Sequence, residues 1–507
     1  MSSPTPAPSI SARRLFRDMA QGSGIYLLGF ILQRMASLLM IPITTRFLSP
    51  ADYGVADLLE QSSSVISMLV GGRLASALGY FYFQADSEEA RRPVVSTTIL
   101  GAAALGLLAG AIFWPFSGRL SQLVFGDPSA GRYFRIVFVC FPTAYALDAI
   151  FTLYRVENRP GLYTAMSLIR MALQMAGIVV LVALFRMRVA GMMWAAVISF
   201  TVMAIGMGIG VFRRMAPAFD LQVFGRMVRY SMPLALGGIA AAFINVGDRF
   251  ILPHYRPLGE LGIYVLACKI GMLTMYIYGS FQVYWSAQVF QIMRRDDAEP
   301  VFARMFTYVV LGMSFSGLAI AVCAHPAVRL LAAPAFQGAT ALVPVIVAAY
   351  CVRGIGEFLR CLFLVEGRPG YDAVCNWLGA VVCLVAYLVL IPKFGAWGAA
   401  YATLAAFIAL GIVSVVWTYR LRPYRVETGR LVKICVASAA AATPYAVIHP
   451  SSLPGLIGMA ALSLALFPLV LWILRFPTAG ELQLSWKALH SLAQLRGRGE
   501  RGAKFSA

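Results

Sequence analysis

The chain is organised by long apolar segments that alternate with short polar ones. Apolar runs of roughly 17 to 25 residues, the length that crosses the hydrocarbon core of a bilayer as an α-helix, recur from one end to the other. We predict about 14 such helices. They are expected near residues 23–48, 53–83, 93–117, 132–154, 161–185, 191–212, 228–252, 261–291, 301–324, 340–364, 371–392, 396–419, 434–448 and 454–474. The pattern predicts an all-α, polytopic membrane protein.

Composition supports this fold class and narrows the partners. Hydrophobic residues make up 60% of the chain and the mean hydropathy is +0.76, far more apolar than a soluble core requires. The net charge of +20 is spread over many loops, so membrane lipid is a better partner for it than nucleic acid. Most of the 42 Lys and Arg residues fall in alternate loops, which predicts a multi-pass protein of the cytoplasmic membrane with both termini in the cytoplasm.

The two halves of the chain contain matching motifs. VENRPG at 156–161 corresponds to VEGRPG at 365–370, and ADYGV at 51–55 corresponds to GELGI at 259–263. Matches in one register predict an internal repeat. Since each copy has six helices, an even number, both copies enter the membrane with the same orientation, and the repeat is parallel.

The repeat predicts five consecutive regions. Two six-helix lobes form the body of the protein, two extra helices follow them, and a cytoplasmic segment lies at each end. We expect these regions at 1–22 (N-terminal segment), 23–212 (N-lobe), 213–419 (C-lobe), 420–474 (two added helices) and 475–507 (amphipathic tail).

Several cations lie at membrane depth, where a charge costs about 2.5 to 3.5 kcal/mol even on insertion scales and usually faces a cavity. Four of them fall on the first two helices of the two repeats, namely Arg34, Arg73, Arg249 and Lys269. If these helices face each other, the cavity between them is cationic and suits a phosphate or diphosphate, because guanidinium groups bind phosphate oxygens in a forked geometry. Arg249 lies near a helix end and could instead extend its side chain to the membrane surface.

Buried acids are fewer and are candidates for ion coupling. Desolvation raises the pKa of a carboxyl group toward neutrality, so any of the buried acids could carry a coupling proton, namely Asp57, Glu60, Asp148, Asp248 and Glu357. Among them, Glu60, Asp148 and Asp248 are the candidates retained. Glu60 is the first choice because it shares a predicted helix with Arg73, although a plain salt bridge explains that pairing equally well. In contrast, Arg353, Glu357 and Arg360 are four and three residues apart, which favours a structural ion-pair network.

Motifs for catalysis are missing from the sequence. No lysine follows a glycine, so there is no phosphate-binding loop, and the four histidines are scattered. No Asp-x-Asp motif is present, and no outer loop is long enough for a catalytic domain. We therefore expect no enzyme, no catalytic residue, no cofactor and no metal site.

Three stretches resemble a known family, the polysaccharide (O-antigen type) flippases of the multidrug/oligosaccharidyl-lipid/polysaccharide exporter superfamily. They are PITTRFLSPADYGVADL (42–58), GDRFILPHYRPLGELGIYVLACKI (247–270) and NWLGAVVCLVAYLVLIPKFGAWGAAYAT (376–403). The resemblance implies two six-helix lobes around a central cavity lined by helices 1, 2, 7 and 8. The sequence is also similar to lipid II flippases, which implies cavity cations on the helices that carry Arg34, Arg73 and Lys269.

The resemblance further implies a function and its partners. The expected substrate is a polyprenyl-diphosphate-linked oligosaccharide, moved from the inner to the outer leaflet by ion-coupled alternating access for a cell-surface polysaccharide such as lipopolysaccharide O-antigen. Glycosyltransferases and a polymerase of the same pathway are the expected partners. The alternatives are a multidrug or organic-cation antiporter of the same superfamily, a glycan polymerase or transferase, and a non-transporting scaffold of an envelope glycan machine.

Overall fold

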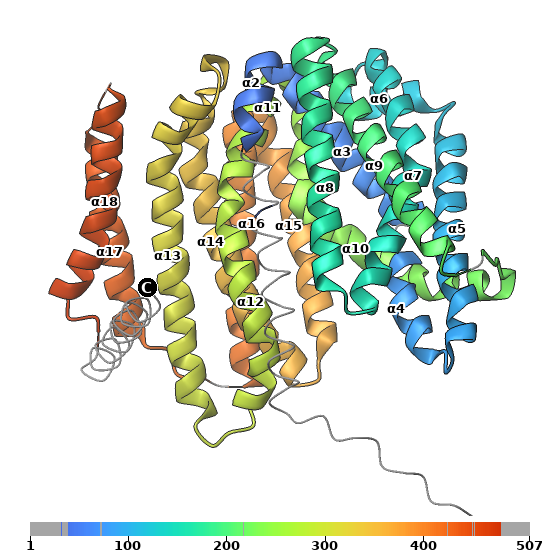
Figure 1. Ribbon diagram of the computed structural model, residues 1–507. Helices are drawn as coiled ribbons and strands as arrows, with labels where there is room; N and C mark the ends of the chain where they lie inside the picture. The colour runs from blue at the N-terminus through green and yellow to red at the C-terminus, as the bar shows by residue number, and fades with distance from the viewer. Residues whose placement is uncertain are drawn as a thin grey trace, which may run out of the picture.

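The structure, a computed structural model, describes residue 32 and residues 39–70, 74–215, 217–422, 424–448, 450 and 452–477. Every secondary-structure element in these ranges is a helix (Figure 1). The first half contains α2 (Ile41–Phe47), α3 (Pro50–Val70), α4 (Leu74–Gln84), α5 (Glu88–Phe113), α6 (Ser117–Phe125), α7 (Gly131–Val156), α8 (Pro160–Ile178) and α9 (Arg188–Phe212). The second half contains α10 (Leu221–Ile251), α11 (Leu258–Gly271), α12 (Leu273–Ile292), α13 (Ala298–Leu331), α14 (Ala339–Val365), α15 (Pro369–Phe394), α16 (Ala396–Leu421), α17 (Thr428–Val447) and α18 (Leu453–Ile473).

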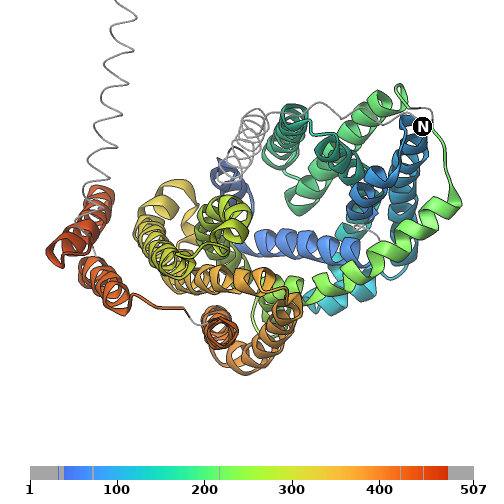
Figure 2. The same cartoon turned by 90° about the horizontal axis from the view of Figure 1, so that it is seen from below.

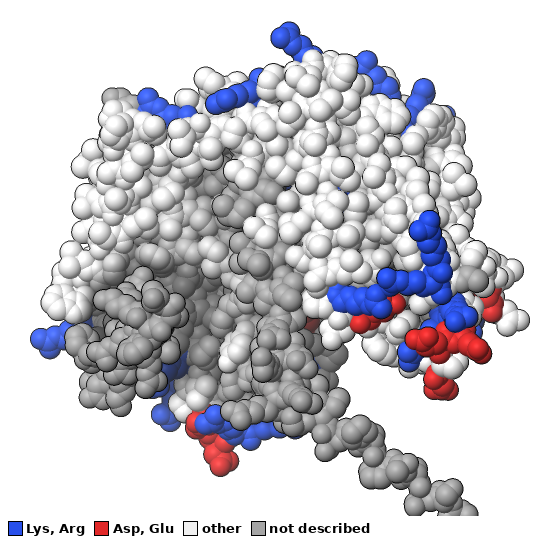
Figure 3. All heavy atoms as spheres, in the orientation of Figure 1, with Lys and Arg blue, Asp and Glu red and all other residues white. Residues whose placement is uncertain are grey.

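The lengths and compositions of these helices are those of membrane spans. Within the described ranges, ten helices are long and apolar enough to cross a membrane, and the bent pair α3 and α4 brings the number to eleven. Figure 3 shows a band across the middle of this face in which the described atoms are almost free of charge, with charged side chains above and below it. The chain is therefore a multi-pass, all-α membrane protein, as predicted.

Three predicted spans are not among these eleven. The segments predicted near 228–252 and 434–448 are helical, as α10 and α17, but neither is among the ten apolar helices counted above. The span predicted near 23–48 lies mostly outside the described residues. The number of about 14 spans thus stays a prediction.

Two helices predicted as single elements are divided in the structure. The segment predicted near 53–83 forms α3 and α4, which lie at 42° to each other. The segment predicted near 261–291 forms α11 and α12, which meet at Met272. Gly271 at this junction lets α14 approach closely, since an added Cβ would lie 2.7 Å from Ile346 Cγ2.

The helices form two bundles and an added pair. We call α3 to α9 the N-lobe and α10 to α16 the C-lobe. In the N-lobe α7 packs against α5 and α9, and in the C-lobe α16 packs against α14 and α15. The pair α17 and α18 packs on α13, at the edge of the C-lobe far from the N-lobe (Figures 1 and 2). Helix α10 contacts α3, α4 and α5 as well as α15, so it bridges the two lobes.

The repeated motifs VENRPG and VEGRPG form the same turn. Each ends a helix with a residue in the left-handed region, Asn158 at φ 53° and Gly367 at φ 67°. In each turn the following arginine donates its backbone N–H back across the helix end, Arg159 to Tyr154 O and Arg368 to Phe363 O, at 2.9 and 2.8 Å. A proline then opens the next helix, where its missing N–H costs nothing. Equivalent sequence thus gives equivalent structure in the two lobes.

The other matching pair, ADYGV and GELGI, is where the lobes touch. An added Cβ on Gly54 would lie 2.8 Å from Leu258 O, and one on Gly262 would lie 1.8 Å from Pro50 O. Gly54 and Pro50 occupy the same positions of the first repeat as Gly262 and Leu258 in the second. The contacts are therefore reciprocal, as expected at a two-fold axis between α3 and α11. This crossing lies toward the upper end of the molecule in Figure 1.

Candidate functional site

A cavity of about 320 Å³ lies between the lobes, directly below the crossing of α3 and α11. Its walls come from α3 of the N-lobe and from α10, α11 and α12 of the C-lobe. The charged side chains that line it are Asp57, Glu60, Arg249 and Lys269. The cavity has the location that was predicted from the repeat, between the first helices of the two halves.

Asp57 and Arg249 form a buried ion pair across the lobes. Asp57 Oδ2 on α3 lies 2.8 Å from Arg249 Nη1 on α10, and the two side chains are only 1% and 4% exposed. The structure does not place Arg249 at the membrane surface. Its guanidinium is neutralised inside the protein, although the residue still contributes to the cavity wall.

Lys269 on α11 is the more accessible cation. Its Nζ lies 3.9 Å from Asp57 Oδ1 and its side chain is 35% exposed. The same Nζ lies 4.6 Å from the centre of the Tyr53 ring, a cation–π contact that orients the ammonium group. Lys269 therefore shares one carboxylate with Arg249, and Glu60 supplies the second carboxylate of the cavity.

The cavity continues into the N-lobe as a second hollow of about 410 Å³. Asp57, Glu60 and Lys269 line both spaces. Asp148 on α7 and Arg170 on α8 lie in the N-lobe hollow, where Arg170 Nη1 donates to Gln174 Oε1 at 3.1 Å. Glu60 thus stands where the two spaces meet, and Asp148 lies deeper within the N-lobe.

The other predicted site residues have different positions. Asp248 lies on the far side of Arg249: its Oδ2 accepts a hydrogen bond from the Tyr264 hydroxyl and its Oδ1 accepts one from the Arg249 backbone N–H. It does not line either cavity. Arg34 and Arg73 lie outside the described residues. The structure therefore brings together Arg249, Lys269 and Glu60, with Asp148 in the adjoining space.

Two roles in the cavity were not predicted from the sequence. Tyr53 contacts Lys269, and Asp57, which was named only among the buried acids, pairs with both cations. A signal for them was present, because positions 53, 57 and 60 are four and three residues apart and so share one helix face with Glu60. Their partners are about 190 to 215 positions away, and sequence spacing carries no information on those contacts.

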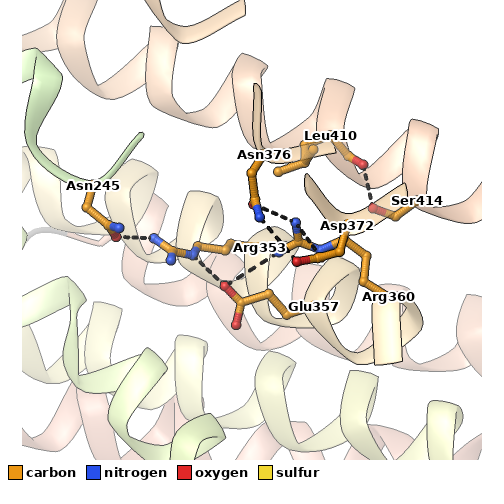
Figure 4. Close-up of polar contacts among 8 residues, drawn as sticks. All are labelled: Asn245, Arg353, Glu357, Arg360, Asp372, Asn376, Leu410 and Ser414. Atoms are coloured by element: carbon orange, nitrogen blue, oxygen red, sulfur yellow. Dashed lines mark hydrogen bonds and ion pairs between the residues drawn. The ribbon is translucent and has the colours of Figure 1, made fainter. Parts of the chain in front are cut away.

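The C-lobe contains a separate polar network, shown in Figure 4. Arg353 Nε lies 2.8 Å from Glu357 Oε1, and Arg360 Nη2 lies 3.9 Å from the same oxygen. Arg360 also reaches α15, where it lies 3.4 Å from Asp372 and donates to Asn376 at 2.9 Å. The predicted ion-pair contacts of Arg353, Glu357 and Arg360 are confirmed, and they join α14 to α15.

No metal-binding group is found in the part of the chain that the structure describes. There, no three His, Cys, Asp or Glu side chains gather in a way that could hold an ion. The charges of the central cavity belong instead to two cations and two carboxylates. Such a cavity can bind an anion through Lys269 and Arg249.

Comparisons with known proteins agree with this architecture. The fold is that of lipid flippases and multidrug transporters of the MOP superfamily. Over 88% of this chain and 98% of the other, it is similar to a lipid II flippase MurJ in an inward closed conformation, with a TM-score of 0.74 and 13% identity. A MATE family multidrug resistance transporter of the MOP superfamily, in its inward-facing conformation, has a TM-score of 0.63 and 14% identity over 77% of this chain and 94% of its own.

A third structure is a MOP superfamily transporter from Pyrococcus furiosus, described as having a binding pocket of reverse polarity. Its TM-score is 0.52 at 13% identity, and the match covers 80% of this chain and 95% of that one. A search of curated proteins found no match. The model of the polysaccharide biosynthesis protein family matches residues 19–285, more than half of the chain. The chain belongs to the polysaccharide biosynthesis protein family.

Proposed function

We propose that this protein is a flippase that moves a polyprenyl-diphosphate-linked oligosaccharide from the inner to the outer leaflet of the cytoplasmic membrane. The observation that carries the proposal is the pair of cations, Lys269 and Arg249, on the wall of a cavity between two lobes. The family is one of polysaccharide biosynthesis, and the fold is shared with a lipid II flippase. Together these features favour an anionic, lipid-linked glycan as the cargo.

The diphosphate is the part of such a substrate that the cavity cations recognise. Lys269 is accessible from the cavity, so it makes the first contact with an entering phosphate oxygen. Arg249 follows if the phosphate replaces Asp57, which carries the same sign of charge as the substrate. Arg34 and Arg73 complete the proposed cation set. The sugars occupy the hollow of the N-lobe, where Ser63, Ser64 and Gln174 offer polar groups, and the prenyl chain stays in lipid.

Replacement of Asp57 by the diphosphate would also couple binding to movement. The ion pair of Asp57 and Arg249 connects α3 to α10, and thus one lobe to the other. A substrate phosphate that takes over Arg249 releases this connection. Outward movement of the charged group is then assisted by an inside-negative potential, which is worth about 2.3 kcal/mol per charge per 100 mV.

We assign ion coupling to carboxylates on helices of the N-lobe. Glu60 lies where the two cavities join, and Asp148 lies in the N-lobe hollow. A proton or sodium ion bound to either group neutralises a charge next to the substrate path. Asp248 is a weaker choice, since Tyr264 and the Arg249 backbone already satisfy its oxygens.

Topology and partners follow from the same proposal. Both termini are placed in the cytoplasm, and glycosyltransferases and a polymerase of one surface-polysaccharide pathway, such as that of O-antigen, supply and consume the cargo. We assign no catalytic role to the protein.

An organic-cation antiporter is the second candidate, because MATE transporters share the fold and because the N-lobe hollow is lined by three carboxylates and two cations, namely Asp57, Glu60, Asp148, Arg170 and Lys269. Purified protein in liposomes distinguishes the two functions. A flippase exposes a polyprenyl-diphosphate oligosaccharide to an impermeant lectin and leaves ethidium gradients unchanged. Ethidium transport without exposure of the glycolipid would reject the proposed function.

A further inference from the structure

A second charged pocket lies at the opposite end of the N-lobe from the crossing of α3 and α11. It has a volume of about 350 Å³. Four arginines line it, Arg91, Arg92, Arg159 and Arg214, together with the carboxylates Glu88 and Glu157. Figure 3 shows arginine or lysine side chains beside acidic ones below the apolar band, at the lower right of this face. The pocket thus lies where lipid headgroups meet water.

Three separate connections build the pocket. Arg91 and Arg92 follow the turn between α4 and α5, Arg159 belongs to the turn between α7 and α8, and Arg214 belongs to the linker between α9 and α10. Cations confined to a single loop would be explained by non-specific attraction to anionic lipid. Here cations from three connections converge on one hollow, which is the geometry of a discrete binding site.

Some of these arginines are held in place by the protein. Arg91 Nε donates to Ala85 O at 3.2 Å, and its guanidinium lies 4.9 Å from the centre of the Tyr82 ring. Arg159 Nε pairs with Glu157 Oε2 at 3.0 Å. For Arg92 and Arg214, no carboxylate of the described residues lies within 4.0 Å. The pocket therefore has a fixed frame and two guanidinium groups without an acidic partner.

The linker that carries Arg214 is itself fixed to the N-lobe. The buried hydroxyl of Ser96 accepts a hydrogen bond from the backbone N–H of Ala218, and that of Thr97 accepts one from Asp220 N–H, both at 2.9 Å. Ser96 and Thr97 are on α5, about one helical turn after Arg91 and Arg92. This attachment holds the linker against the helix that carries Arg91 and Arg92.

We infer that this pocket binds an anionic phosphate group and thereby ties the linker between the lobes to the loops of the N-lobe. Arg92 and Arg214 supply the free guanidinium donors, which match phosphate oxygens in a forked geometry. The phosphate belongs either to an anionic phospholipid of the inner leaflet or to a soluble phosphate compound. The inference does not depend on what the central cavity transports.

Binding is measured on purified, delipidated full-length protein with two probes, dioctanoyl phosphatidylglycerol and inorganic phosphate. Dioctanoyl phosphatidylcholine is the reference, because its choline cancels the phosphate charge. The test variant is Arg92→Gln/Arg214→Gln. The control, Arg294→Gln/Arg304→Gln, removes two exposed arginines near the turn between α12 and α13 and changes the net charge equally. Unfolding midpoints without probe show whether both variants are folded.

We expect the test variant to bind its probe at least about tenfold more weakly than the wild type, because it lacks both guanidinium donors to the phosphate oxygens. The control should bind as the wild type does. Selective binding of phosphatidylglycerol identifies a lipid headgroup as the source, and binding of inorganic phosphate with the same dependence on Arg92 and Arg214 identifies a soluble one. Equal loss in both variants, or no preference over phosphatidylcholine and no phosphate binding, would overturn the inference.

Discussion

Asp57 on α3 and Arg249 on α10 are 192 residues apart in sequence, yet Asp57 Oδ2 lies 2.8 Å from Arg249 Nη1 in a nearly inaccessible interior. The pair joins the two lobes beneath the glycine crossing. Removal of one partner of a buried pair leaves an uncompensated charge, whereas removal of both leaves none. The single and double substitutions of this pair should therefore differ in their effect on the free energy of unfolding.

Asp57→Leu should destabilise the protein by about 3 to 5 kcal/mol, because the Arg249 charge stays buried without its partner. Asp57→Leu/Arg249→Met should recover most of this loss. The unfolding midpoint in detergent and the amount of protein in the membrane are the measurements. A double variant as unstable as Asp57→Leu alone would show that the unpaired charge is not the cause.

Gly262→Ala should be more damaging than Gly259→Ala, although both add one methyl group to α11. The new Cβ at 262 would lie 1.8 Å from Pro50 O, while at 259 the nearest atom is Pro50 Cβ at 4.0 Å. Overpacking of this kind costs about 1 to 3 kcal/mol or more, and it forces α3 away from α11. Unfolding midpoints of the two variants give the comparison. Similar midpoints would contradict the close crossing.

Much of the fold was predictable from the sequence because a bilayer demands continuous apolar helices whose backbone groups are satisfied internally. VENRPG and VEGRPG were recognisable as repeats because each contains the residues that its turn requires, Asn158 or Gly367 at positive φ and then a proline. The division of the predicted helix near 261–291 at Met272 was not predicted, since the apolar pattern runs through it without interruption.

The candidate site was predictable only in part. Spacing alone indicated the contacts of Arg353, Glu357 and Arg360, which lie on one turn after another of α14. That Lys269 and Glu60 line a cavity was also inferred, from charge at membrane depth. The pairing of Arg249 with Asp57 could not be predicted, because the two residues lie in different lobes and their contact depends on how the lobes pack. Local sequence spacing does not indicate such a contact.

Glu60→Gln should lower ion-driven transport while substrate binding is largely kept. The carboxylate lies at the junction of the two cavities. Its loss removes a titratable group but leaves the contacts of Lys269 and Arg249 with Asp57 in place. The measurement is the dependence of glycolipid transfer on a proton or sodium gradient in liposomes. Glu89→Gln, in the exposed first turn of α5, serves as the control. An unchanged gradient dependence in Glu60→Gln would exclude this residue as the coupling group.

Reporter fusions should give an alternating topology with the inner ends of the lobes in the cytoplasm. We expect cytoplasmic signals from fusions at Ser87, Pro217, Asp297 and Ala507, and external signals from fusions at Gly126, Pro334 and Pro450. A cytoplasmic signal at Pro450 would show that α17 and α18 do not cross the membrane as a pair.

The central claim is that cavity cations bind the diphosphate of a lipid-linked glycan. The most direct measurement is the rate at which Lys269→Gln transfers a polyprenyl-diphosphate oligosaccharide in liposomes. The comparison is with Lys393→Gln, which removes an exposed lysine far from the cavity, at equal amounts of folded protein. A charge-assisted contact of about 1.5 to 3 kcal/mol predicts a rate at least about tenfold lower for Lys269→Gln and unchanged for Lys393→Gln. Equal rates for both variants and the wild type would contradict the account.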